Sequence, residues 1–318
     1  MKAIGGFLEE EDLLSEPNNY RIRKEFSFSN GRSALFFILK NTTPQKIYLP
    51  YYSCDALIQP IKKLRISYSF IPLNRSLEFK QLPNLKGDEF IIGVNYYGLK
   101  TQYIKSLWSL FKTRLIVDNS QAFFAPKINT WSFNSLRKFF GVPDGSFLDY
   151  PNFIEIQRSA KGIKPNTSHL KLRKEGKLDE AYEYYQSLEK EQTVNNLKMS
   201  AYSSRVMQQI DLKSIRLKRI NNYRILSRKL DESNKLNLNL NGQVPLYYPY
   251  WPKIQIDHQK IWNKMIYTPI LWKECLDRED NFDFEKRMSG ELIPLPIDHR
   301  YSLREMETII DTIKQHER

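Results

Sequence analysis

The side chains best suited to chemistry lie in two short segments of this sequence. Residues 118–121 (D-N-S-Q) close an apolar run, and residues 135–145 place Lys138 among aromatic residues just before a Gly/Pro turn. A lysine held in apolar surroundings has a lowered pKa, so its amine can attack an aldehyde and form a Schiff base. We therefore expect a desolvated, nucleophilic Lys138, and an acid, Asp118, at the end of a buried strand.

The elements that must position these side chains alternate between strands and helices. Short apolar runs bounded by turn residues predict strands at residues 46–50, 65–71, 89–95 and 114–117. Segments with helical periodicity lie between them, at residues 32–40, 56–64 and 103–111. This alternation is typical of a mostly parallel sheet covered on both faces. Such sheets bind ligands at the carboxyl ends of their strands, where Asp118 stands.

A lysine that forms a Schiff base, with an acid for a pyridinium nitrogen, is how proteins hold pyridoxal 5′-phosphate (PLP). The two segments resemble the DegT–StrS group of PLP-dependent aminotransferases, in which a strand ends in D-x-x-Q and a later lysine carries the cofactor. Asp118, Gln121 and Lys138 stand at those positions. The resemblance runs from about residue 30 to the C-terminus.

The resemblance implies the α/β fold of the PLP-dependent transferases, fold type I. This is a large, mostly parallel sheet domain followed by a small α+β C-terminal domain. We place the PLP-binding domain at residues 1–195, and the long helix with the small domain at residues 196–318. After helical patterns at 179–192 and 197–233, the sequence predicts short strands and helices at residues 244–248, 258–265, 292–296 and 302–315.

The resemblance also implies roles for the three motif residues. Lys138 would form the Schiff base and carry a proton between substrate and cofactor carbons. Asp118 would keep the ring nitrogen protonated, because a carboxylate partner raises that nitrogen's pKa. Gln121 would contact the 3-hydroxyl side of the cofactor. The structural alternatives are a surface lysine lying on aromatic residues and an Asx cap at a strand end.

A cofactor phosphate is expected at the helix start formed by Gly31, Arg32 and Ser33. Free N–H groups and the positive end of a helix dipole favour an anion there, and arginine is a good phosphate ligand. The segment resembles the S-G-T-A-A-L of the family, with Arg32 at the threonine position and Ser33 at the following alanine. The alternative is an ordinary capped core helix with no ligand.

Other positions depart from the family pattern around the phosphate. Where the family has a serine five residues before the lysine, this chain has Phe133, so Ser135 or Ser132 would have to substitute. Ser203 lines up with the asparagine of the family's N-x-R, which reaches the cofactor phosphate of a neighbouring subunit, and Arg205 matches the arginine.

The surroundings of the cofactor ring also differ. Cys54 stands where the family has an aromatic residue that stacks on the ring. Either Tyr52 supplies the ring instead, or the tyrosines there pack at the end of the sheet. Asn95 follows the next strand, at the position of the histidine in the family's H-L-Y-G, and is expected to face the pocket.

Composition narrows the class of protein. The chain has 318 residues, of which 41% are hydrophobic and 27% charged, enough for a substantial core. The two cysteines fit a reducing compartment, and no apolar run is long enough to span a membrane, so we expect a cytoplasmic protein. The four histidines have no metal-ligand spacing. The net charge of +13 is spread along amphipathic segments without a nucleic-acid motif, and suits an anionic substrate.

The sequence therefore predicts a PLP-dependent aminotransferase. Its implied substrates are an amino donor, usually glutamate in the family, and a nucleotide-linked keto-sugar used for surface polysaccharide. The resemblance implies a homodimer; we expect no metal, nucleic acid or membrane partner. Two alternatives stay open. One is another PLP reaction, such as sugar dehydration or transamination of a compound other than a sugar; the other is a degenerate, non-catalytic relative.

Overall fold

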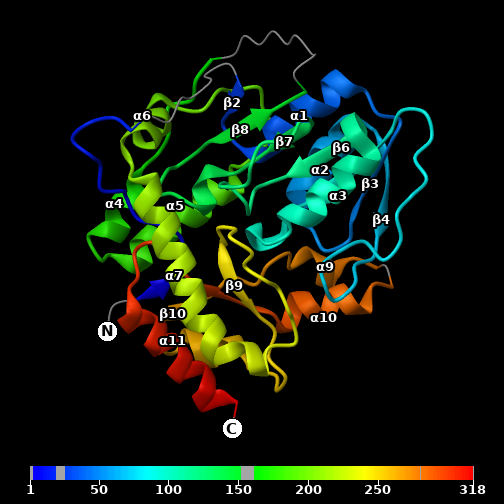
Figure 1. Ribbon diagram of the computed structural model, residues 1–318. Helices are drawn as coiled ribbons and strands as arrows, with labels where there is room; N and C mark the ends of the chain where they lie inside the picture. The colour runs from blue at the N-terminus through cyan, green and yellow to red at the C-terminus, as the bar shows by residue number, and fades with distance from the viewer. Residues whose placement is uncertain (1–2, 19–25, 152–160, 280, 318) are drawn as a thin grey trace.

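The computed structural model describes residues 3–18, 26–151, 161–279 and 281–317, and its centre is a seven-stranded sheet (Figure 1). The strand order is β2-β8-β7-β6-β5-β3-β4. The strands are β2 (Ser27–Phe28), β3 (Lys46–Pro50), β4 (Ser67–Ile71), β5 (Glu89–Val94), β6 (Leu115–Asp118), β7 (Trp131–Phe133) and β8 (Ser146–Asp149). The four strands expected from the sequence are all present.

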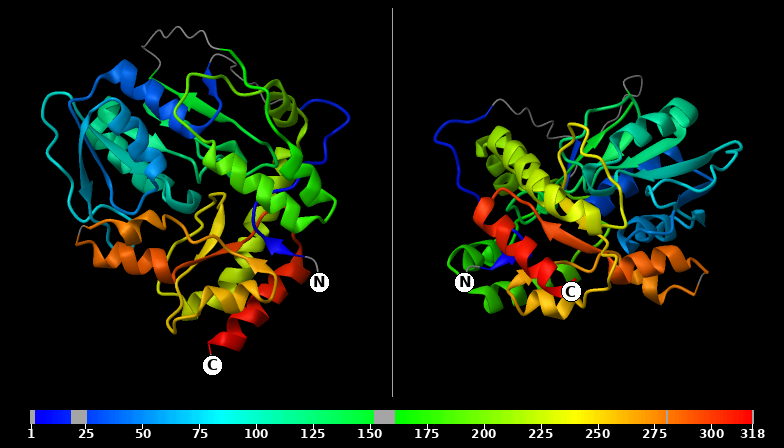
Figure 2. Two further views of the ribbon diagram at one scale, coloured as in Figure 1. Left: turned by 180° about the vertical axis from the view of Figure 1, so that it is seen from behind. Right: turned by 60° about the horizontal axis from the view of Figure 1, so that its bottom comes forward.

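The sheet is mostly parallel, as expected. Strands β4, β3, β5, β6 and β7 pair in parallel, whereas β8 runs antiparallel to both β7 and β2. Helices α1 (Gly31–Thr42), α2 (Asp55–Lys63) and α3 (Thr101–Phe111) form the predicted crossovers. The β3–α2–β4 and β5–α3–β6 connections move across the sheet in opposite directions, so right-handed crossovers put α2 and α3 on opposite faces. Figures 1 and 2 show this arrangement.

Strand β6 is buried because its neighbours cover both of its edges and helices cover its faces. Leu115, Ile116 and Val117 are fully buried, and β6 pairs with β5 on one side and β7 on the other. An uninterrupted apolar strand that ends in one acid is thus the local pattern that places Asp118 at the carboxyl edge of the sheet.

The helical region between the two halves differs from the expectation. The structure has α4 (Ser168–Lys174), α5 (Leu178–Lys190), α6 (Ala201–Gln209) and α7 (Leu212–Leu230). The single long helical region predicted for residues 197–233 is wrong, because the chain is extended at Ile210. The Asp211 side chain then accepts the N–H of Ser214 and caps the start of α7.

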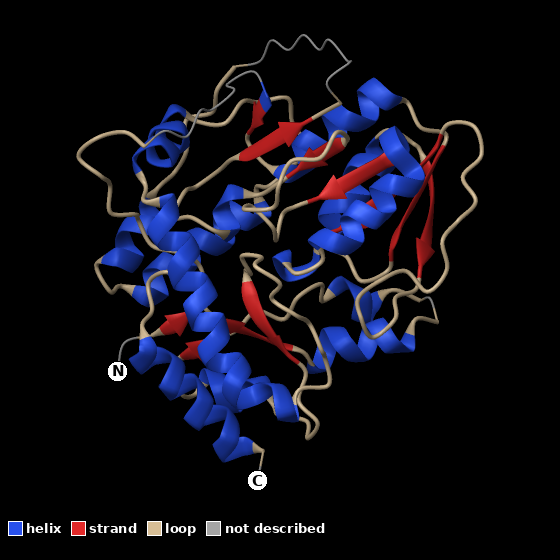
Figure 3. Ribbon diagram, in the orientation of Figure 1, coloured by secondary structure: helices blue, strands red, loops and turns tan. Residues whose placement is uncertain are grey.

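The C-terminal part builds two small sheets beside helices (Figure 3). Strand β11 (Ile293–Pro296) pairs antiparallel with β9 (Tyr247–Tyr250), which begins three residues later than the strand expected at 244–248. The helices are α8 (His258–Trp262), α9 (Glu274–Asp277), α10 (Asp283–Glu291) and α11 (Leu303–His316). The part of the chain that the structure describes also has the 3-10 turns η2 (Tyr96–Gly98), η3 (Lys112–Arg114), η4 (Leu136–Lys138) and η5 (Asp231–Ser233).

The N-terminal segment joins this C-terminal part. Strand β1 (Ile4–Gly5) pairs in parallel with β10 (Ile266–Tyr267), and the Gly5 N–H donates to the Tyr301 hydroxyl at 2.6 Å. The expected large domain included these residues. The outer bounds of the two expected domains, residues 1 and 318, lie outside the described residues. Within the described part of the chain, no helix is long and apolar enough to cross a membrane.

Candidate cofactor site

The carboxyl edge of the sheet brings together three of the residues that the sequence singled out. Parallel strands end at one edge, so Cys54 after β3, Asn95 after β5 and Asp118 at the end of β6 lie along it. Burial raises the pKa of the Cys54 thiol, the charge of Lys138 opposes this, and the charge of Asp118 adds to it. The charges of Lys138 and Asp118 therefore both act on the pKa of the Cys54 thiol.

The Asp118 side chain accepts a hydrogen bond from the backbone and lies at the carboxyl edge of the sheet. Its side chain is buried, with 7% of the residue exposed, and its Oδ1 accepts the N–H of Ser120 at 2.7 Å. The Asx turn named as the structural alternative is thus present. Oδ2 has no donor among the described residues, which leaves one carboxylate oxygen for a ligand.

Lys138 is exposed, so the expectation of a desolvated lysine is wrong. The lysine ends the 3-10 turn η4, and the two residues after it turn inward: Phe139 and Phe140 are fully buried in a cluster with Met207 and Leu246. The aromatic side chains fill the core beneath the turn, and the amine is left on the outer side. Its role as cofactor lysine stays a prediction.

Gln121 and Asn95 bind the loop that follows β5. The Tyr97 N–H donates to Gln121 Oε1 at 2.8 Å. Asn95 is 1% exposed; its Oδ1 accepts the Lys100 N–H at 3.0 Å, and its Nδ2 donates to the Thr101 hydroxyl at 3.1 Å. Asn95 therefore fixes the start of α3, and the side-chain amides of Gln121 and Asn95 both hold the loop between β5 and α3 in place.

Tyr52 does not lie open for ring stacking. It is fully buried, its ring packs edge-on against Trp272 with centroids 4.3 Å apart, and its hydroxyl lies 3.3 Å from that of Tyr97. Burial raises the pKa of Tyr52 well above its usual value, so the phenol stays neutral. The alternative of packing at the sheet end is the one the structure has, and Cys54 is partly exposed.

The start of α1 offers backbone donors, but its side chains are engaged elsewhere. The Asn30 side chain caps the helix by accepting the Ser33 N–H at 2.9 Å. The Ser33 hydroxyl donates to Asn195 Oδ1 at 3.2 Å and accepts the Asn195 N–H at 3.1 Å. Arg32 Nε donates to the Gln59 side chain on the surface at 2.9 Å, so the expected direction of Arg32 toward the phosphate is wrong.

The N–H groups of Gly31 and Arg32 have no acceptor among the described residues. They are the first-turn donors of a 12-residue helix and remain available to an anion.

The three serines considered as phosphate ligands, Ser135, Ser132 and Ser203, lie in different surroundings. Ser135 precedes η4, and its hydroxyl makes no cap there. Ser132 is buried in β7 beside a cavity of about 30 Å³, too small for a cofactor. Ser203 is fully buried and donates to the Asp144 carboxylate, so the contact expected with a neighbouring subunit's phosphate is wrong for this side chain. The Ser203 hydroxyl reaches less far than the asparagine amide it replaces, and it forms its hydrogen bond within its own chain.

Two residues that the sequence analysis passed over support the site from outside the sheet. Arg278 donates to the carbonyls of Tyr51 and Ser53 at 2.7 and 2.8 Å and so holds the end of β3. Asp144 accepts the Ser200 N–H at 2.7 Å and ties the turn after Lys138 to α6. Both contacts join segments far apart in sequence, and no local pattern marks either residue.

The donor set fits pyridoxal 5′-phosphate. Asp118 keeps one carboxylate oxygen without a partner, Lys138 offers an exposed amine, and the start of α1 offers two backbone N–H groups. These are the groups suited to a pyridine nitrogen, an aldehyde and a phosphate. Across the described residues, no cluster of His, Cys, Asp or Glu is suited to a metal ion.

Comparisons with known proteins find the similarity in structure alone. No protein-family model and no curated protein matches the sequence. Among solved structures, the chain is similar to PseC from Helicobacter pylori, an aminotransferase involved in the biosynthesis of pseudoaminic acid. The TM-score is 0.68 at 12% identity, over 99% of each chain. The fold is that of aminotransferases.

Two further solved structures agree. The sugar aminotransferase CalS13 from Micromonospora echinospora gives a TM-score of 0.62 at 11% identity, over 91% of this chain and 86% of that one. A DegT DnrJ EryC1 StrS aminotransferase from Brucella abortus gives 0.60 at 12% identity, over 92% and 86%. The mostly parallel sheet was thus predicted correctly from the alternation of strands and helices, and the aminotransferase fold from the resemblance carried by Asp118, Gln121 and Lys138.

Proposed function

We propose that this chain is a PLP-dependent aminotransferase that transfers an amino group from glutamate to a nucleotide-linked keto-sugar. The observation that carries the proposal is that the charges of Asp118 and Lys138 both act on the pKa of the Cys54 thiol at the carboxyl edge of the sheet. The fold shared with sugar aminotransferases supports the same reaction class. A net charge of +13 favours an anionic substrate.

Each residue has a physical task in this proposal. When bound, pyridoxal 5′-phosphate supplies an aldehyde for the amino group and an electron-withdrawing ring. Asp118 Oδ2 holds a proton on the ring nitrogen, while Oδ1 keeps the side chain oriented through Ser120. Lys138 attaches the cofactor and moves a proton with Nζ. The N–H groups of Gly31 and Arg32 bind the phosphate.

The cellular setting belongs to the same proposal. We infer a cytoplasmic protein, because nucleotide-linked sugars are made in the compartment that holds the nucleotides. We also infer a homodimer that serves surface polysaccharide synthesis. We keep the division at residues 1–195 and 196–318, with strand β1 pairing across it. Gln121, Ser135 and Cys54 complete the proposed cofactor surroundings.

A second candidate is a non-catalytic relative. It is favoured by the start of α1, where Asn30 Nδ2 donates to the Gln192 side chain and the Thr193 carbonyl, and Ser33 binds Asn195. Residues 192–195 thus form hydrogen bonds with the side chains of Asn30 and Ser33, at the helix start where the phosphate was expected. The exposed Lys138 is also compatible with a lysine that binds nothing.

A substrate panel separates these functions. The purified protein is given PLP, glutamate and a series of nucleotide-linked keto-sugars at two salt concentrations, and formation of 2-oxoglutarate is followed. We expect turnover of a sugar, with kcat/KM falling as salt shortens the Debye length from about 30 to 8 Å. Amination of a simple keto acid alone would refute the sugar substrate, and release of water without amination would indicate dehydration. Inertness in all assays would favour the non-catalytic relative.

A further inference from the structure

The N-terminal segment contacts the turn that carries Lys138. Gly141, three residues after the lysine, donates its N–H to Glu11 Oε1 at 2.7 Å. A Cβ added at Gly141 would lie 1.7 Å from the Glu9 carbonyl oxygen, so the two backbones touch. Gly141 does not have a positive φ, and close packing rather than conformation explains a glycine here. Residues 9–11 are called the N-terminal strap below.

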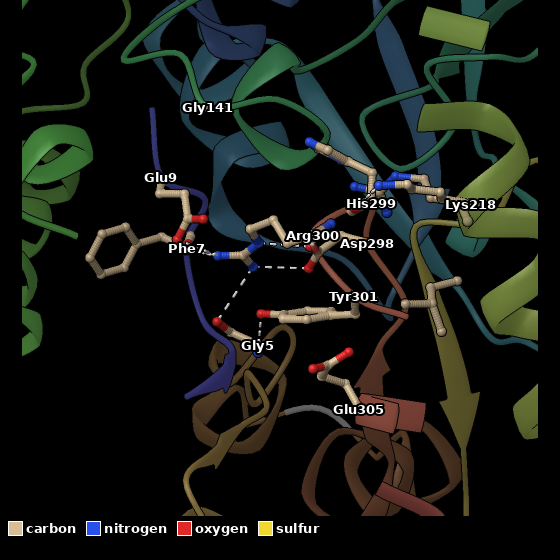
Figure 4. Close-up of polar contacts among 12 residues, drawn as sticks. Gly5, Phe7, Glu9, Gly141, Lys218, Asp298, His299, Arg300, Tyr301 and Glu305 are labelled. Carbon is tan, nitrogen blue, oxygen red and sulfur yellow. Dashed lines mark hydrogen bonds and ion pairs between the residues drawn. The ribbon is translucent and has the colours of Figure 1, made fainter. Parts of the chain in front are cut away.

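The strap is anchored on the C-terminal part of the chain. Glu11 Oε2 lies 3.0 Å from His299 Nε2, and the Glu11 side chain is 9% exposed. Arg300, which follows His299 in the sequence, binds the Asp298 carboxylate through two nitrogens. Its Nη1 donates to the Phe7 carbonyl at 3.1 Å. Figure 4 shows Arg300 between Asp298 and the N-terminal segment. The strap therefore has a fixed support on the side away from Lys138.

The lysine turn is held at both of its ends. Leu136 donates its N–H to the Gly145 carbonyl at 3.0 Å and closes the turn. On one side Asp144 is bound by the N–H and hydroxyl of Ser200. On the other side, Glu11 is the side chain that binds the Gly141 N–H. A buried carboxylate on a backbone N–H is a strong hydrogen bond, so its loss should loosen the backbone around Gly141, while the buried Phe139 and Phe140 rings still anchor the turn.

We propose that Glu11 is a positioning residue for Lys138. It binds the Gly141 N–H and so fixes the turn that presents the amine, with His299 holding the carboxylate in place. For catalysis, this inference rests on the proposed function; for the position of the amine, it stands on the contacts alone. Glu11 does not touch the reacting atoms.

The test uses the full chain and three variants. Glu11→Ala removes both contacts, Glu11→Gln keeps an acceptor for Gly141, and Asp12→Ala is the matched control. Asp12 is the next residue, and its 97% exposed side chain pairs with Lys174 on the surface. If Glu11→Ala does not fold, Glu11→Asp, which shortens the reach by one methylene, replaces it.

The first readouts need no cofactor. Hydrogen–deuterium exchange is measured for peptides covering residues 136–145, and acetylation of Lys138 is timed by mass spectrometry against Lys127. We expect Glu11→Ala to speed exchange in the turn about tenfold, as for one lost charged hydrogen bond. The Lys138 acetylation rate should change severalfold, with Asp12→Ala unchanged and Glu11→Gln largely restored. Unchanged exchange and unchanged Lys138 reactivity in Glu11→Ala would overturn the proposal.

A second readout addresses catalysis. In Glu11→Ala, kcat should fall about tenfold with little change in the KM of either substrate, because the lysine moves protons but does not bind the sugar. A rise in KM at constant kcat would contradict the positioning role. If wild-type protein aminates nothing, the proposed function fails, whereas exchange and acetylation still decide the role of Glu11.

Discussion

At the scale of single residues, the proposed function gives Asp118 two tasks, one for each oxygen. Oδ1 closes the turn with the Ser120 N–H, and Oδ2, which has no donor among the described residues, would bind the cofactor nitrogen. An asparagine keeps the oxygen that closes the turn and removes the charge. The structural and the chemical roles of this residue can therefore be separated by one substitution.

We predict that Asp118→Asn folds but loses most turnover. The amide oxygen still accepts the Ser120 N–H, so the melting temperature should change by only a few degrees. Loss of a charged hydrogen bond of about 1.5–3 kcal/mol should lower kcat about 10- to 100-fold. Asp149→Asn is the matched control, because Asp149 pairs with exposed Lys127. Near-normal transamination by Asp118→Asn would show that Asp118 is only structural.

At the scale of elements, the start of α1 is the point where this chain departs most from a free phosphate site. Asn195 bonds the Ser33 hydroxyl in both directions, and Asn30 binds the same segment. A phosphate bound there would compete with these contacts.

We predict that Asn195→Ala tightens PLP binding. Removing about 1 kcal/mol of competing hydrogen bonds should lower the dissociation constant about fivefold, measured by absorbance titration. Arg32→Ala is the control: its side chain bonds Gln59 on the surface, so the constant should stay within twofold. Weaker binding in Asn195→Ala would show that this segment supports the phosphate, and weaker binding in Arg32→Ala would restore its role as a phosphate ligand.

The close contact between the strap and the lysine turn gives another element-scale prediction. Gly141→Ala should destabilise the protein by about 1–3 kcal/mol, because its Cβ would meet the Glu9 carbonyl at 1.7 Å and backbone must move. Gly162→Ala is the control, since among the described residues its Cβ would meet only the Met199 carbonyl, at 3.8 Å. Urea unfolding measures both. Equal stability of the Gly141→Ala and wild-type proteins would mean that the strap does not pack on the turn.

Elements with strong local patterns could be predicted from the sequence, and contacts between distant segments could not. Strand β3 has the predicted bounds, β5 ends one residue earlier than predicted, and β6 is shifted by one residue, since apolar runs bounded by turn residues are local signals. Burial of Tyr52 depends on Trp272, and the Glu11–Gly141 contact spans 130 residues. The exposure of Lys138 was missed for a similar reason: its aromatic neighbours pack inward onto Met207.

At the scale of the whole molecule, buried histidines link stability to pH. Burial lowers the pKa of His169 to about 4, with the charge of Arg137 adding to the effect. The His169 ring lies beside the stacked rings of Phe7 and Tyr185, with its centroid 6.0 Å from each. The N-terminal segment and α5 thus pack on a histidine that stays neutral in the folded protein.

We predict a loss of stability between pH 6.5 and 4. The unfolded chain binds a proton at its usual pKa of about 6.5, whereas folded His169 does not until about pH 4. Acid therefore favours unfolding in this window, by on the order of 2–3 kcal/mol in total. Urea midpoints across this range should fall less for His169→Gln than for wild type, with His258 present in both. Parallel pH profiles would show that His169 is not the source.

The proposed function requires that Lys138 hold pyridoxal 5′-phosphate. The direct measurement is to mix purified protein with the cofactor, reduce with borohydride, and locate the pyridoxyl group by peptide mass mapping. A visible absorbance band before reduction and a label on Lys138, absent in Lys138→Ala, is the predicted result. A label on another lysine, or bound cofactor that leaves Lys138 unmodified, would contradict the assignment of this site.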